Sequence, residues 1–292
     1  MAPIAISVAQ QYTQTAHDIK YTRDIICNPE LEEFVGPMEK QPHKGVYLLP
    51  NLMTTGALFA GFYSIIAGIG GQFIPAAIAV VVAGFLDGLD GRLARLTNTQ
   101  SDFGTQYDSL ADLISFGIAP ALLMYNWSLS FMKQDSVSLG KLGWLAAFLY
   151  VAMAALRLAR FNTQAGTAEK SYFQGLATPA AAGTMVSTIW FCADQGISGE
   201  SVRWLMWFLT VGLGLLMFSQ VRYYSGKTEP QGDKVPLFWI FVLVLIIALL
   251  AIDPPTVFLA IGIIYVSSGL VLTLHGKYRR KLRRKASKEK SK

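Results

Sequence analysis

Eight long apolar stretches restrict this chain of 292 residues to one class of fold. Each is long enough to cross the roughly 30 Å hydrocarbon core of a bilayer as a helix. They occupy residues 46–68, 73–95, 106–126, 141–161, 178–195, 203–220, 235–252 and 255–275. In lipid, a spanning segment must satisfy its backbone hydrogen bonds internally, which an α-helix does and an open strand does not. The sequence therefore predicts an all-α, polytopic membrane helix bundle.

The positive charge of the chain is concentrated at its C-terminal end. The formal net charge is +6, but residues 277–292 carry ten Lys or Arg and one Glu, which leaves −3 for the rest. A basic run after an apolar stretch favours binding to anionic lipid, with roughly 1 kcal/mol per basic residue near the membrane surface. No aromatic or base-reading module accompanies it, so we do not expect nucleic-acid binding. The two cysteines, Cys27 and Cys192, indicate no disulfide framework.

The basic residues in the loops predict how the bundle is oriented. Loops 92–105, 157–177 and 221–234 lie on one side of the membrane, and the opposite loops contain few basic residues, chiefly Lys133 and Arg203. The first group holds Arg92, Arg95, Arg157, Arg160, Lys170, Arg222, Lys227 and Lys234. Because cytoplasmic loops are enriched in Lys and Arg, we expect a multi-pass protein of a bacterial-type inner membrane with both termini in the cytoplasm.

Four aspartates lie within or beside membrane-length segments, at Asp87, Asp90, Asp108 and Asp112. A charged side chain near the bilayer centre costs at least about 2.5 to 3.5 kcal/mol, so these groups need a compensating partner. The first two stand at i and i+3 on a helix and the last two at i and i+4, so each pair shares one face. Two helices can therefore bring the carboxylates together. Oxygen ligands without a nearby His or Cys favour Mg²⁺ or Mn²⁺ over zinc.

Two other interpretations of the aspartates stay open. They could be helix-end acids solvated at the headgroup level, or they could mark a path for ions or protons. Small residues accompany them: we expect Gly84, Gly88, Gly91 and Ala94 to end the first helix and Gly104 to precede the second. Such residues let helix backbones approach closely. A transport path has no evident need for this pattern.

The spacing of these residues resembles the signature of the CDP-alcohol phosphatidyltransferases. The series Asp87-x2-Asp90-Gly91-x2-Ala94-Arg95-x8-Gly104-x3-Asp108-x3-Asp112 fits that signature at every fixed position. Members of the family are integral membrane enzymes that displace CMP from a CDP-linked lipid or alcohol with a hydroxyl nucleophile. The resemblance implies a catalytic six-helix bundle at 46–220, preceded by a cytoplasmic extension at 1–45. Two added helices at 221–276 and a basic cytoplasmic tail at 277–292 would follow.

The same resemblance implies roles for individual residues. Asp87, Asp90, Asp108 and Asp112 would hold divalent metal, Mg²⁺ or Mn²⁺ and two ions, with Asp112 also the catalytic base that accepts the proton of the nucleophile. The nucleotide and its phosphates would contact Asn51, Asp90, Gly91, Ala94, Arg95 and Gly104. Two of these have simpler explanations, since Arg95 could anchor a helix end and Asn51 could cap a helix after Pro50.

A second group of residues concerns the acceptor alcohol. AALRLARFN at 154–162 and EKSYFQGLATPAAA at 169–182, together with DSLADLISFGIAP at 108–120, resemble the membrane-type phosphatidylserine synthases. That resemblance implies transfer from CDP-diacylglycerol to L-serine with release of CMP, and a homodimer. The acceptor would be bound by Arg157, Arg160, Phe161 and Asn162. Arg160 is favoured for the serine carboxylate, although both arginines could instead bind lipid phosphate or orient the span.

Several alternatives remain for the acceptor and the mechanism. Glycerol-3-phosphate, inositol phosphate and choline are other acceptors that the common motif allows. The synthases usually carry the sequence GLPTP, and this chain has Ala177 in place of the first proline. We therefore expect this loop to be less rigid. Another class of serine-lipid synthase carries His-x-Lys-x4-Asp pairs, but HDIKYTRD at 17–24 has the wrong spacing and no second copy. We therefore expect direct attack by the acceptor hydroxyl, without a covalent enzyme intermediate.

Overall fold

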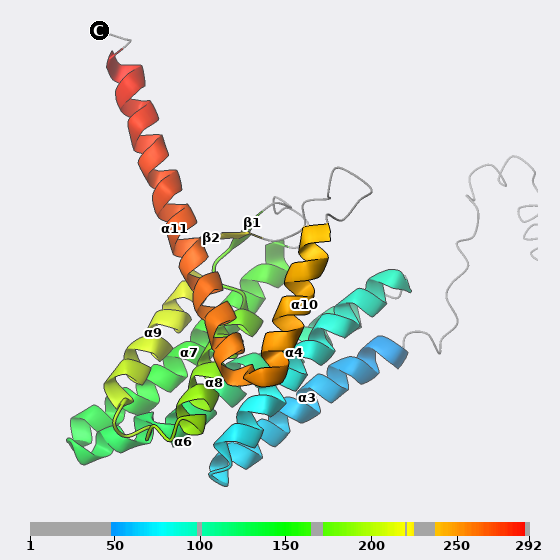
Figure 1. Ribbon diagram of the computed structural model, residues 1–292, viewed down its shortest axis with the longest axis vertical. Helices are drawn as coiled ribbons and strands as arrows, with labels where there is room; N and C mark the ends of the chain where they lie inside the picture. Colours follow the sequence, from blue (N-terminus) through cyan, green and yellow to red (C-terminus); the bar gives the residue numbers. More distant parts are fainter. Residues whose placement is uncertain (1–47, 98–100, 165–171, 220, 225–236, 290–292) are drawn as a thin grey trace, which may run out of the picture. The chain divides into compact units, whose positions relative to one another are not determined.

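The computed structural model of the chain describes residues 48–97, 101–164, 172–219, 221–224 and 237–289. The expectations for residues 1–45, including 17–24, lie outside these ranges, as do Lys170, Lys227 and Lys234. Within the described ranges the fold is a bundle of helices with one short two-stranded sheet (Figure 1).

Helices lie at all eight predicted spans. The first two are α3 (Leu48–Ile69) and α4 (Phe73–Leu96), and the third runs without a break through α5 (Asp102–Asp112), η1 (Leu113–Ile118) and α6 (Ala119–Trp127). After η2 (Leu129–Gln134) follow α7 (Val137–Gln164), α8 (Thr178–Asp194), α9 (Arg203–Phe218), α10 (Leu237–Ile252) and α11 (Pro254–Glu289). Strands β1 (Tyr172–Gln174) and β2 (Arg222–Tyr224) pair antiparallel and were not predicted.

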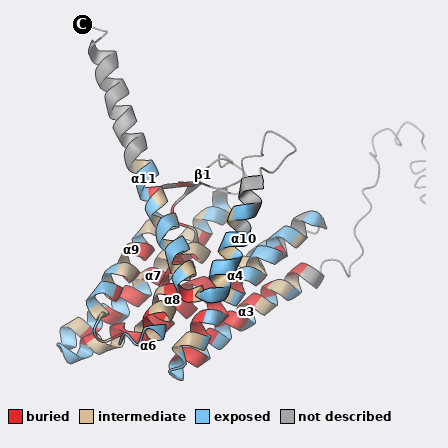
Figure 2. Ribbon diagram, viewed as in Figure 1, coloured by how far each residue is buried: buried red, intermediate tan, exposed pale blue. Residues whose placement is uncertain are grey.

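The described helices have the length and surface of membrane spans. Five stretches are long and apolar enough to cross a bilayer: Pro50–Ile69, Phe73–Leu93, Phe103–Trp127, Val137–Thr163 and Pro254–Thr273. Helices α8, α9 and α10 lie at predicted spans but have only 17, 16 and 16 residues. Large apolar side chains such as Phe59, Phe208 and Ile247 are exposed on the outer faces (Figure 2). A soluble protein rarely exposes so much apolar surface, so the chain is an integral membrane protein.

Two helix boundaries differ from the predictions. Helix α4 ends at Leu96, one residue after the predicted span 73–95, but Gly104 lies inside the first turn of α5 instead of before it. The Ser101 hydroxyl caps that helix by accepting the Gly104 N–H at 3.0 Å, a signal that was present in the sequence. Helix α11 runs through Glu289 and does not end near residue 275, because Lys, Arg and Ala, which dominate its last turns, favour helix.

Small residues bring the helices of the bundle close together. A methyl group added at Gly61 of α3 would lie 2.5 Å from the Ser115 hydroxyl oxygen of η1, and that hydroxyl donates to the Ala57 carbonyl at 3.0 Å. On the α9 side, a methyl group at Gly214 would lie 3.2 Å from the Tyr150 Cα of α7. In a membrane, close packing of this kind contributes much of the attraction between helices, because lipid provides little hydrophobic drive.

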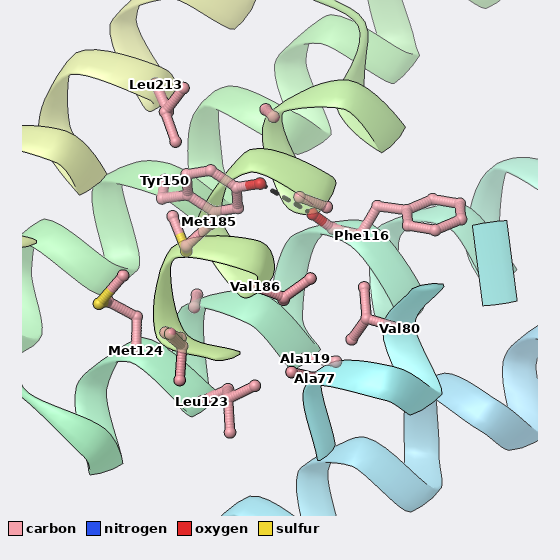
Figure 3. Close-up of a cluster of buried hydrophobic side chains, with 14 of the residues drawn as sticks. Ala77, Val80, Phe116, Ala119, Leu123, Met124, Tyr150, Met185, Val186 and Leu213 are labelled. Carbon is pink, nitrogen blue, oxygen red and sulfur yellow. Dashed lines mark hydrogen bonds between the residues drawn. The ribbon is translucent and has the colours of Figure 1, made fainter. Parts of the chain in front are cut away.

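A π-helical turn follows the second aspartate pair directly. Pro120 has no N–H, so the Phe116 carbonyl four residues earlier lacks its α-helical donor. The buried Tyr150 hydroxyl of α7 donates to that carbonyl at 3.1 Å (Figure 3). Phe116, Tyr150, Met185 and Leu213 then form one buried cluster with neighbouring alanines. This contact holds the helix carrying Asp108 and Asp112 against α7.

We expect the Tyr150→Phe substitution to destabilise the bundle by about 1 to 3 kcal/mol. It keeps the ring but removes the hydroxyl that donates to the Phe116 carbonyl, and loss of a buried hydrogen bond carries a penalty of that size. Thermal unfolding in detergent measures the effect, with Tyr63→Phe on the exposed face of α3 as the matched control. Equal melting temperatures for the two variants would contradict this assignment.

The short sheet joins the end of α9 to the start of α8. The Gly175 N–H donates to the Val221 carbonyl at 2.8 Å, and the Leu176 N–H donates to the Leu216 carbonyl at 3.1 Å. Gly175 has φ +85°, and a Cβ there would overlap the Met217 carbonyl, so only glycine fits. Ala177 has φ −62°, the angle that a proline ring would impose, so its backbone matches that of the usual GLPTP loop.

The sheet also anchors the added helix α11. The buried ring of Tyr223 stacks on Tyr265 with centroids 5.4 Å apart, and its hydroxyl lies 3.4 Å from the Val266 carbonyl. A Cβ on Gly269 would overlap the Tyr223 ring, so glycine is required there. Burial, followed by the neighbouring Tyr265, raises the pKa of Tyr223 to about 12, which keeps its hydroxyl neutral at physiological pH.

Candidate active site

The structure brings the four aspartates together between the last turns of α4 and the second half of α5. Asp87, Asp90 and Asp108 each offer a carboxylate oxygen, and these oxygens lie within 4.8 Å of one another. The carboxyl group of Asp112 forms a hydrogen bond with that of Asp87. Both pairs point into the same site because Asp87 and Asp90 share one helical face of α4, and Asp108 and Asp112 share one face of α5.

This arrangement is electrostatically unfavourable without a cation. Two unit charges 4.8 Å apart repel by roughly 3 kcal/mol at an effective dielectric constant of about 20. Among the described residues, no Lys or Arg forms an ion pair with any of the four carboxylates. Three to four carboxylates with no His or Cys in the group provide the hard oxygen donors that Mg²⁺ and Mn²⁺ prefer. The cluster can therefore bind a divalent cation.

Helix α3 supports the cluster through two hydroxyl groups that the sequence analysis missed. The Thr54 hydroxyl donates to Asp90 Oδ2 at 2.8 Å, and Asp90 is buried. Next to it, the Thr55 hydroxyl lies 2.9 Å from that of Tyr107, one residue before Asp108. Thr54 and Thr55 lie one helix turn after Asn51 inside a predicted membrane span. Two adjacent polar residues at such a place could have indicated this supporting role.

The residues expected to bind nucleotide lie around the C-terminal part of α4, which also carries Asp87 and Asp90. Asn51 is inside α3 and does not cap it, and its side-chain oxygen would lie 3.7 Å from a Cβ on Gly104. A Cβ on Gly91 would meet no atom within 4 Å, so the surface of α4 beside the carboxylates is open. Ala94 and Arg95 belong to the last turns of α4, but their side chains lie outside the described part of the structure.

The four residues expected to bind the acceptor separate into two groups. Arg157 is mostly buried, donates to the Thr178 hydroxyl at 2.7 Å and lies within electrostatic range of Asp112. Its Nε is buried without a hydrogen-bond partner in the described ranges. Arg160 instead donates to the Phe218 carbonyl at 3.1 Å and lies over the Phe218 ring at 5.2 Å. Arg157 therefore interacts with Asp112, whereas the contacts described for Arg160 include the end of α9.

The other two acceptor residues follow Arg160 on α7. The Asn162 amide donates to the Ser109 hydroxyl of α5 at 2.9 Å, one residue after Asp108. Phe161 is about half exposed, at 50% of its accessible surface. Asn162 therefore connects α7 to the aspartate helix, and Phe161 lies on the bundle surface.

The family model of the CDP-alcohol phosphatidyltransferases matches residues 47–218, from the start of α3 to the end of α9. The chain belongs to this family. It is therefore a membrane transferase, and its aspartate cluster is the motif on which the family resemblance was based. Helices α10 and α11 lie outside the matched region.

Individual relatives are similar over most of the chain. The CDP-diacylglycerol–serine O-phosphatidyltransferase of Helicobacter pylori is 37% identical over 229 residues, which is 77% of this chain and 91% of the relative. The protein of the same name from Methanocaldococcus jannaschii is 34% identical over 190 residues, 65% of this chain and 80% of the relative. The archaetidylserine synthase of Methanothermobacter thermautotrophicus is 34% identical over 177 residues, 60% of this chain and 69% of the relative.

Proposed function

We propose that the chain transfers the phosphatidyl group of CDP-diacylglycerol to the hydroxyl of L-serine, giving phosphatidylserine and CMP. The observation that carries this proposal is a group of three clustered carboxylates joined by Asp112, with the mostly buried Arg157 within electrostatic range of Asp112. The cluster suits a diphosphate substrate with its cations, and the arginine suits an acceptor that has a carboxylate. The names of the similar proteins from Helicobacter and Methanocaldococcus support serine as the acceptor.

The aspartates are the residues we propose for metal binding, with Asp87, Asp90 and Asp108 as the nearest set and Asp112 beside them. Two ions, Mg²⁺ or Mn²⁺, fit the number of carboxylates. When bound, the metal neutralises diphosphate charge and makes a nearby hydroxyl more acidic. Thr54 holds the Asp90 carboxylate in place through its hydrogen bond, which fixes one ligand before substrate enters.

In the proposed reaction, the serine hydroxyl oxygen attacks the lipid-proximal phosphorus of CDP-diacylglycerol. The new P–O bond forms as the bond to the bridging oxygen of the diphosphate breaks, and CMP leaves with that electron pair. The Asp112 carboxylate accepts the hydroxyl proton, because it is in the cluster and also near Arg157. We propose direct attack, with no phosphatidyl group attached to the protein.

The polar surroundings suggest how the substrates are held. The diphosphate would lie along the open surface of α4 at Gly91, with Ala94, Arg95, Asn51 and Gly104 around it. The serine carboxylate would pair with Arg157, whose Nε has no other partner among the described residues. Arg92 follows Asp90 by two residues on α4, and Arg157 lies within electrostatic range of Asp112. Because these basic residues belong to the predicted cytoplasmic side, we propose that the site faces the cytoplasm.

Removal of divalent cations is expected to abolish CMP release. Purified protein with CDP-diacylglycerol and tritiated serine should form labelled lipid only when Mg²⁺ or Mn²⁺ is present, because otherwise the carboxylates repel the diphosphate. The assay measures CMP and labelled lipid together. EDTA should stop both, and an excess of Mg²⁺ or Mn²⁺ over EDTA should restore both. Turnover that is unchanged in EDTA would contradict the metal assignment.

The same assay separates the alternative functions. Lipid formed from glycerol-3-phosphate, inositol phosphate or choline, and none from serine, would replace the proposed acceptor. A phosphorylated acceptor would need several basic groups, whereas the cation that we place at the acceptor is Arg157, within electrostatic range of Asp112. Ion flux through reconstituted vesicles without any CMP release would favour a transporter.

A further inference from the structure

A mostly apolar groove lies between the shared bundle and the added helix α11. Its volume is about 300 Å³, and it is lined by α4, η1, α8 and α11. Representative lining residues are Val80, Gly84, Phe116, Gly183, Phe258 and Tyr265. Thr184 contributes a hydroxyl, but that group donates to the Ala180 carbonyl at 2.8 Å and offers the groove no free donor. The groove is suited to a hydrocarbon ligand.

The groove lies next to the candidate active site along α4. Its lining residue Gly84 lies about one turn before Asp87, so the groove leads toward the carboxylates. On α11, Tyr265 lines the groove and also lies within electrostatic range of Arg157, which is in turn near Asp112. A molecule with a charged head at the aspartates and an apolar chain would therefore fit both regions at once.

The wall of the groove on α8 has open space at Gly183 and a close contact with α11 at Gly262. A Cβ on Gly183 of α8 would meet no atom within 4 Å, so the middle of this wall is open. At the next residue of α8, a Cβ on Gly262 of α11 would lie 2.6 Å from the Thr184 hydroxyl oxygen, so the two helices touch there. From Phe258 to Tyr265 the α11 wall spans about 10 Å, most of the roughly 15 Å depth of one bilayer leaflet.

We propose that this groove holds one acyl chain of the CDP-linked lipid, and that α11 thereby determines chain selectivity. The inference rests on the proposed function, because the occupant is the tail of its lipid substrate. Helix α11 lies outside the region that matches the family, so this wall is an addition to the shared bundle. The stacking of Tyr223 on Tyr265 and the close fit of Gly269 hold α11 at this distance from the site.

The test fills the groove without touching the carboxylates. The Gly183→Leu variant places a side chain in the open space, and Gly212→Leu on α9 is the control, because a Cβ there also meets nothing within 4 Å and the residue does not line the groove. Each variant is assayed with serine and two lipids, CDP-dioleoylglycerol and CDP-dibutanoylglycerol. We expect Gly183→Leu to lower kcat/KM about tenfold for the dioleoyl lipid only.

A second variant makes the result independent of folding defects. Ile261→Ala removes atoms from the α11 wall, so we expect it to raise the preference for the longer lipid relative to wild type. A ratio of long-chain to short-chain kcat/KM that is unchanged in both groove variants would overturn the proposal, as would an equal loss on both lipids. Wild-type protein that releases no CMP with serine from either lipid would instead overturn the proposed function.

Discussion

The Asp108→Asn variant is expected to lose CMP release by about 10²- to 10³-fold, the scale seen when one group that stabilises transition-state charge is removed. Asp108 supplies one of the three carboxylate oxygens that lie within 4.8 Å of one another, and a neutral amide binds a divalent cation far more weakly. The measurement is serine-dependent CMP release by purified protein in saturating Mn²⁺.

Stability measurements separate a lost ligand from a misfolded protein. Because the carboxylates repel one another, replacing one of them should leave the melting temperature in EDTA equal to or above that of wild type. Added Mn²⁺ should raise the melting temperature of wild type and raise that of the variant much less. Asp194→Asn, at the exposed end of α8, is the matched control and should behave as wild type. Full turnover by the Asp108 variant would remove Asp108 from the metal site.

The Arg157→Gln variant is expected to lose selectivity for serine by about 10- to 100-fold. A hydrogen bond to a charged group contributes about 1.5 to 3 kcal/mol, and the proposed partner of Arg157 is the serine carboxylate. Ethanolamine has the same hydroxyl and amine but no carboxylate, so its kcat/KM should fall far less. The measurement is the ratio of the two kcat/KM values in wild type and variant.

The neighbouring arginine provides the control for that experiment. Arg160 donates to the Phe218 carbonyl and lies over its ring, so Arg160→Gln should lower stability while the serine-to-ethanolamine ratio stays near the wild-type value. If Arg160→Gln changes the ratio and Arg157→Gln does not, the assignment made from the sequence resemblance is the better one. An equal loss for both acceptors in Arg157→Gln would indicate that Arg157 binds the lipid phosphate or supports the fold.

Much of the bundle could be predicted because membrane spans follow from local composition. A stretch of about 20 apolar residues must form a helix in lipid, whatever surrounds it, so all eight positions are helical. The spacing of the four aspartates also predicted that the two members of each pair lie on the same side of their helix, because i, i+3 and i, i+4 neighbours share a helical face. The boundary at Glu289 was missed since hydropathy detects where a helix leaves the membrane and not where helix formation stops.

Other features depended on contacts between residues distant in the sequence. The hydrogen bond from Thr54 to Asp90 joins positions 36 residues apart, and no local pattern indicates it. The different surroundings of two arginines one helix turn apart, Thr178 and Asp112 for Arg157 and Phe218 for Arg160, also depend on how the helices pack. The groove along α11 exists only because Gly262 and Gly269 let that helix approach the bundle while Gly183 leaves space. Sequence alone determined the spans and the aspartate spacing, because both are properties of single helices. Only the tertiary structure decided which side chains from different helices meet, because that depends on packing across the whole bundle.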